Sequence, residues 1–96
     1  MLSVDYVKQN VIKLLPIDSN LYDEQLDILV ASSMNKLVNE GVDFNLIDED
    51  TSVAMDYIVC CSYQIAMDLD MDVDGNRMNQ QYITRVNTLR TSLINV

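Results

Sequence analysis

Histidine is absent from this chain of 96 residues, and glycine, proline and cysteine are scarce, with two, one and two copies. The lack of histidine excludes a nucleophile that is activated by a Cys/His pair. So few glycines and prolines leave little for the tight turns of an all-β fold. Because 49% of the residues are hydrophobic, the chain can build a core without disulfides or a metal. We expect one all-α domain over residues 1–96.

Long apolar runs and a basic leader segment are also missing. No apolar stretch approaches the ~18 residues of a membrane span, and the N-terminus lacks the basic and apolar regions of a signal peptide. Cys60 and Cys61 are adjacent in a predicted helix, so their side chains diverge and cannot easily pair with each other. We expect a soluble protein with free, buried thiols, which suits a reducing cytoplasm.

Basic residues are few and unevenly placed. The net charge is −9, which argues against general nucleic-acid binding because phosphate contact needs clustered Lys and Arg. Residues 1–74 hold all 15 acids and three lysines, a net charge of −12, whereas residues 75–96 hold three arginines, a net charge of +3. The chain is therefore acidic over most of its length and basic at its end.

Residues 51–69 carry the strongest helical pattern, with apolar residues at steps of three and four. These residues are Ala54, Ile58, Cys61, Ile65 and Leu69. Other apolar residues widen the surface beyond one stripe, as in a helix buried among others. They are Val53, Met55, Val59, Ala66 and Met67. With a cap at Asp50, Thr51 or Ser52, this segment is predicted to be the central helix of a small bundle of about four helices.

Three other amphipathic helices are predicted to pack against the central one. The first is capped by Ser3 and stopped by Pro16, the second runs from a cap at Ser19 or Asn20 to Gly41, and the last spans about 78–94. The predicted inward residues of the first helix are Val4, Val7, Val11 and Leu14. Those of the second are Leu26, Leu29, Val30, Met34, Leu37 and Val38. Those of the last are Tyr82, Val86, Leu89 and Leu93.

The connection before the central helix mixes apolar and acidic residues. Phe44, Leu46 and Ile47 are too apolar to be freely solvated, so we expect this loop to fold back onto the bundle. The acids before and after them are expected to form a solvated rim. They are Asp43, Asp48, Glu49 and Asp50.

A second acidic segment, Asp70-x-Asp72-x-Asp74-Gly75, matches the first half of a calcium-binding loop. The second half departs from that pattern, because Arg77 stands where an apolar residue is usual and Gln81 replaces the bidentate glutamate. The other interpretation is an acidic, solvated turn between two helices, and the missing ligand favours it. Asp70, Asp72 and Asp74 are thus the candidate metal ligands, and no cofactor is predicted.

The arginines Arg77, Arg85 and Arg90 are candidate interface residues of the last helix. Arg90 lies near the end of that helix, where a cation also interacts favourably with the helix dipole. The functional interpretation is a basic docking face, with Arg85 and Arg90 meeting an acidic surface such as that of a neighbouring copy. No phosphate loop, zinc spacing, Ser–His arrangement or carboxylate pair in an apolar pocket occurs. We therefore do not expect an enzyme.

Several sequence segments, which together cover nearly the whole chain, occur in the order that is typical of one protein family. They are Val11-Ile12-Lys13-Leu14-Leu15-Pro16-Ile17, Asp23-x-x-Leu26-x-x-Leu29-Val30-x-x-Ser33, Gly41, the central helix with Tyr57 and Tyr63, and Leu89-Arg90-x-x-Leu93. This arrangement resembles the small head–tail connector proteins of tailed bacteriophages, also described as DNA-packaging or portal-adaptor proteins.

The resemblance implies a structural virion protein without catalysis. Its copies would form a ring under the portal and extend the channel through which DNA passes without specific binding. The implied partners are other copies, the portal protein and the next tail-proximal connector protein, with no membrane. The protein would be found in the virion, and in the host cytoplasm during assembly. The alternative is a small acidic regulatory protein, either a DNA mimic or a weak calcium binder.

Overall fold

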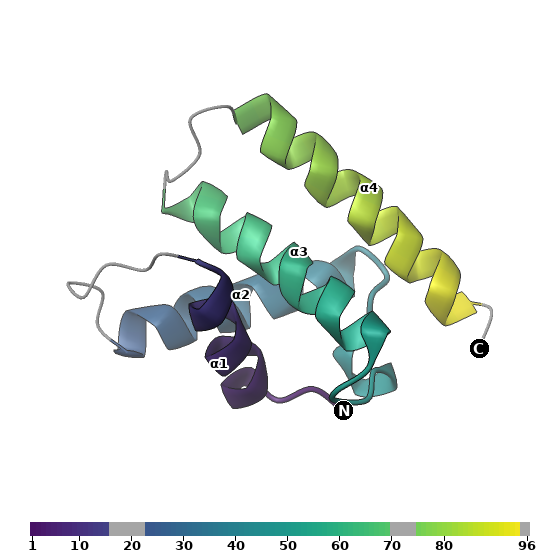
Figure 1. The fold of residues 1–96 in the computed structure, drawn as a ribbon, viewed down its shortest axis with the longest axis horizontal. Helices are drawn as coiled ribbons and strands as arrows, with labels where there is room; N and C mark the ends of the chain where they lie inside the picture. Colours follow the sequence, from purple (N-terminus) through teal and green to yellow (C-terminus); the bar gives the residue numbers. More distant parts are fainter. Residues whose placement is uncertain (16–22, 70–74, 95–96) are drawn as a thin grey trace.

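Helices make up most of the structure, a computed structural model that describes residues 1–15, 23–69 and 75–94 (Figure 1). The helices are α1 (Val4–Leu14), α2 (Asp23–Asn39), α3 (Ser52–Asp68) and α4 (Gly75–Ile94), with a short 3₁₀ turn, η1 (Phe44–Leu46). No strand occurs within the described ranges. The predicted all-α fold, a small bundle of four helices, is confirmed.

Helix α3 is the centre of the bundle, as predicted. It packs against α1, α2 and α4, and Figure 1 shows it between α4 on one side and α1 and α2 on the other. Its buried residues are Ala54, Tyr57, Ile58, Cys60, Cys61, Ser62, Ile65 and Ala66. Burial on so many sides explains why this helix is apolar well beyond a single stripe.

Local side-chain chemistry sets the helix boundaries. The Ser3 hydroxyl accepts from the Tyr6 N–H at 3.1 Å, and the Thr51 hydroxyl accepts from the Ala54 N–H at 3.1 Å. Thr51 is thus the cap of α3 among the three candidates. Leu15, which precedes Pro16, is extended with φ −110° and ψ 138°, because proline disfavours a helical conformation in the residue before it. The predicted caps of α2, Ser19 and Asn20, lie outside the described residues.

Gly41 ends the α2 region in the left-handed conformation, with φ +91°, as predicted. The Val42 N–H then donates to the Leu37 carbonyl at 2.8 Å, which satisfies a carbonyl at the helix end. A Cβ atom at this position would lie 3.2 Å from Cδ of Arg90. Both the backbone conformation and the approach of α4 therefore favour glycine.

The segment after α2 folds back onto the bundle through some of its apolar residues. Val42 and Ile47 are buried and Phe44 is half-buried, whereas Leu46 is 67% exposed. Leu2, which the sequence pattern did not single out, is fully buried, and its N–H donates to the Phe44 carbonyl at 3.1 Å. The N-terminal residues thus hold this connection in place.

Several residues expected on apolar faces are exposed instead. They are Val4, Leu14, Val38, Leu46 and Met55. All but Met55 lie at or next to the end of an element. Helix α4 also begins at Gly75, three residues earlier than the periodicity predicted.

Candidate functional site

The inner side of α4 packs against α3 and the end of α2. Tyr82, Val86 and Leu89 are buried. The Tyr82 hydroxyl donates to the Glu40 carboxylate at 2.9 Å, and the Lys36 ammonium lies 5.5 Å from the centre of the Tyr82 ring. Burial, and then the bond to Glu40, raise the pKa of Tyr82 above its usual range. These contacts fix which face of α4 remains outside.

Arg85 forms an ion pair across the α3–α4 contact. Its Nη1 atom lies 3.3 Å from Oδ1 of Asp56, and both side chains are a little over 40% exposed. A pair this open to solvent contributes little to stability. A guanidinium group has five N–H donors, so this single contact leaves donors for a second carboxylate.

A surface groove of about 540 Å³ lies beside this ion pair. Its lining residues are Tyr63 of α3 and Arg77, Gln80, Gln81, Thr84 and Arg85 of α4. The Tyr63 hydroxyl donates to Oε1 of Gln81 at 2.8 Å, which leaves the Gln81 amide nitrogen as a donor. Two guanidinium groups and an amide nitrogen make the groove suited to carboxylate groups.

The sequence singled out two residues of this groove and missed four. Arg77 and Arg85 were candidates because of their charge, whereas Tyr63, Gln80, Gln81 and Thr84 were not predicted to be site residues. The spacing of 77, 81 and 84 does place them on one helix face, and that signal was available. The contribution of Tyr63 was not, because it depends on how α3 and α4 pack.

Arg90, the third candidate, does not line this groove. Its aliphatic carbons lie over Gly41, and its guanidinium group donates to the side-chain oxygen of Asn87. The structure therefore brings Arg77 and Arg85 together and places Arg90 at the contact between α4 and the end of α2.

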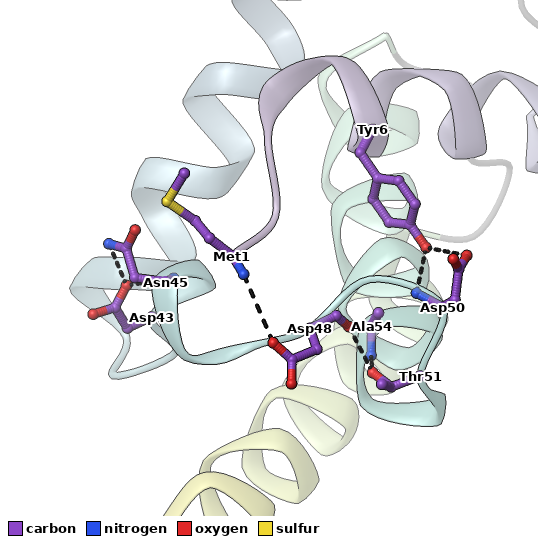
Figure 2. A network of polar contacts seen from close by, with 8 residues as sticks. All are labelled: Met1, Tyr6, Asp43, Asn45, Asp48, Asp50, Thr51 and Ala54. Atoms are coloured by element: carbon purple, nitrogen blue, oxygen red, sulfur yellow. Dashed lines mark hydrogen bonds and ion pairs between the residues drawn. The ribbon is translucent and has the colours of Figure 1, made fainter.

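An acidic corner, which we define as Asp48, Glu49 and Asp50, precedes α3. All three residues are exposed, in agreement with the predicted solvated rim. Figure 2 shows how its backbone is held: the Asp50 N–H donates to the Tyr6 hydroxyl at 2.9 Å, and that hydroxyl donates to Oδ1 of Asp50 at 3.3 Å. The Asp48 carboxylate lies 3.9 Å from the terminal amine of Met1.

The corner is separated from the fourth predicted rim residue, Asp43, by η1. Asp43 is half-buried, and its carboxylate accepts from both the backbone N–H of Asn45 at 2.9 Å and its side-chain amide at 3.0 Å (Figure 2). This carboxylate therefore caps η1, which is a structural use of the acid.

The chemically reactive side chains of α3 face the core. Cys60 and Cys61 are free and buried, as expected. Burial raises the pKa of each thiol to about 12, so both are protonated and poor nucleophiles at neutral pH. Burial, and then the neighbouring Cys61, also raise the pKa of Tyr57 far above its usual range.

The calcium-loop candidates Asp70, Asp72 and Asp74 lie outside the described residues. Within the described ranges, no three side chains of His, Cys, Asp or Glu come together in a way that would hold a metal ion. Across these same ranges, the helices are also too short or too polar to span a membrane.

Comparison with protein-family models, curated proteins and solved structures gives no match to this chain. Its functional interpretation therefore depends on its own charge distribution, surface groove and helical pattern.

Proposed function

We propose that this chain is a structural virion protein, a head–tail connector whose copies form a ring under the portal of a tailed bacteriophage. The ring extends the DNA channel, with the portal on one side and the next tail-proximal connector protein on the other. The order of helical segments named above supports this proposal. The protein acts by assembly, in the virion, and not by catalysis.

The observation that carries the proposal is the separation of charge on one small helical domain. Helix α4 has three arginines and no acid, whereas the rest of the chain holds all 15 acidic residues. A ring requires a heterologous interface, in which two different faces of neighbouring subunits meet. A basic face and an acidic face on the same subunit meet that requirement.

The overall charge also suits a channel. At a net charge of −9, a ring of many copies would present an acidic wall that repels the phosphate backbone. DNA would then pass without adhering to the wall. Specific DNA binding would need clustered basic residues.

Mass measurement tests this proposal. The purified chain, alone and with the portal protein from the same genome, would be studied by native mass spectrometry and negative-stain electron microscopy at low salt. We expect closed rings, either alone or bound to the portal. The mass of a ring alone should be an integral multiple of 10.9 kDa. A monomer under both conditions would contradict the proposal and favour a small acidic regulatory protein.

A further inference from the structure

We propose that the groove between α3 and α4 receives the acidic corner, Asp48 to Asp50, of a second copy of this chain. This inference rests on the proposed ring and identifies the two surfaces that meet in it. Repeated from copy to copy, the contact joins subunits head to tail.

The groove supplies the chemistry for carboxylate recognition. Arg77 and Arg85 line it together, and planar guanidinium groups bind carboxylates with matched geometry. Residues 75–94 contain no acid, and each guanidinium group has five N–H donors, so a contact within the chain need not use all of them. The carboxylate of Asp56 approaches from α3, and its Oδ1 atom lies 3.3 Å from Nη1 of Arg85.

The acidic corner is suited to be the ligand because its backbone is already ordered. Asp50 is in the left-handed conformation, with φ 62°, which is unusual for a residue other than glycine. Tyr6 bonds both the N–H and the carboxylate of Asp50, while the terminal amine lies near Asp48. Glu49 is exposed between them. A preorganised loop loses little entropy when it binds.

The corner lies far from the Tyr63 and Arg77 end of the groove in its own chain. Tyr63, in the groove, lies about 20 Å along α3 from Asp50, at 1.5 Å per residue. Figure 1 shows the start of α3, next to the corner, at the opposite end from the start of α4, where Arg77 lies. A contact between the corner and the Arg77 end of the groove therefore needs two copies, whereas Arg85, which pairs with Asp56, lies nearer to the corner of its own chain.

A charge-exchange experiment tests the contact. D48K/E49K makes the corner basic, and R77E/R85E makes the groove acidic, so each variant alone has two surfaces of the same sign. We expect each to associate about tenfold more weakly than the wild type at low salt. In a 1:1 mixture every contact can again be of opposite sign, so association should return to within about threefold of the wild type.

Control variants change the charge elsewhere on the chain, D5K/E24K by the same amount as D48K/E49K and K13E by half as much as R77E/R85E. D5K/E24K reverses two exposed acids outside the corner, and K13E reverses an exposed base outside the groove. Both should associate like the wild type. Circular dichroism confirms folding. If R77E/R85E is unfolded, R77Q/R85Q tests the weakening, and the single reversal R77E mixed with D48K/E49K tests the recovery. Loss of association in the controls, or no recovery in the mixture, would overturn the contact.

A crosslinking measurement separates failure of the contact from failure of the ring. Subunits with E49C would be mixed with subunits with Q80C under mild oxidation, since the native cysteines are buried. We expect a crosslink in the mixture at least tenfold above that of E49C with the exposed control N35C. Rings without this crosslink would overturn the contact and leave the proposed function intact. The crosslink in a closed dimer would support the contact and contradict the ring.

Discussion

The hydroxyl groups of Tyr57 and Tyr82 are both buried but differ in their hydrogen bonding. Tyr57 is fully buried, and its hydroxyl makes no hydrogen bond of normal geometry within the described residues, although the Cys61 thiol lies beside it. Tyr82 donates to the Glu40 carboxylate at 2.9 Å. A buried polar group without a partner costs about 1–3 kcal/mol, whereas a satisfied one contributes about 1 kcal/mol or more.

The same substitution at these two tyrosines should therefore have opposite effects. We expect Tyr57→Phe to raise the free energy of unfolding by up to about 1 kcal/mol, because it removes an unsatisfied hydroxyl. Tyr82→Phe should lower it by about 1 kcal/mol, because Glu40 loses its donor. Urea denaturation of dilute protein, followed by circular dichroism, measures both. A loss of stability in both variants would show that the Tyr57 hydroxyl is satisfied by Cys61.

At the scale of the element, α3 carries two thiols that ionise at a higher pH in the folded chain than in the unfolded chain. Burial raises the pKa of Cys60 and Cys61 from 9.0 to about 12. Below pH 9 the thiols are protonated in both the folded and the unfolded chain, so they do not affect the pH dependence. Between pH 9 and 12 only the unfolded chain loses these protons, and the free energy of unfolding must fall as the pH rises.

The expected decline is about 1.4 kcal/mol per pH unit for each thiol. We predict a steep loss of stability above pH 9 in the wild type and a shallower one in Cys60→Ala/Cys61→Ala. The variant would be less stable at every pH because of the cavities it creates, so the slope and not the absolute value is the readout. Urea denaturation at a series of pH values from 7 to about 10.5 measures it. Equal slopes would mean that the thiols ionise in the folded chain.

The helices could be predicted from the sequence because each depends on local information. The periodicity of α3, the capping by Ser3 and the turn at Gly41 follow from residue type and spacing alone. The burial of Leu2 could not be predicted in this way, since it depends on a hydrogen bond to Phe44, far along the chain. The exposure of Met55 depends equally on which sides of α3 its neighbours leave uncovered.

The candidate site was predictable only in part, for the same reason. Charge alone identified Arg77, Arg85 and Arg90, but the distances between them and their partners come from the packing of helices. Arg85 meets Asp56 across 29 residues of sequence, and Arg90 meets Gly41 across the α2–α4 contact. Spacing along one helix cannot distinguish Arg77 and Arg85, which line the groove, from Arg90, which contacts Gly41 and Asn87 instead.

For the whole molecule, the net charge of −9 acts on folding, whereas the uneven placement of charge acts on association. Within one subunit the excess of acids repels itself and destabilises the compact state. Between subunits, the proposed contact joins an acidic surface to a basic one and is attractive. Salt screens both interactions, with a Debye length of about 8 Å at physiological ionic strength.

We therefore predict that raising NaCl from low concentration to about 0.15 M increases the Tm of dilute, monomeric protein by a few degrees while it weakens association of concentrated protein. Thermal melts and native mass spectrometry measure the two effects. In D5N/E24Q/E49Q, which carries three fewer negative charges, the rise in Tm should be smaller because there is less repulsion to screen. If salt lowered the Tm, attractive ion pairs such as Lys8–Asp27, at 3.0 Å, would outweigh the repulsion. If salt strengthened association, apolar contact or relief of the net repulsion between subunits would outweigh the attraction between the corner and the groove.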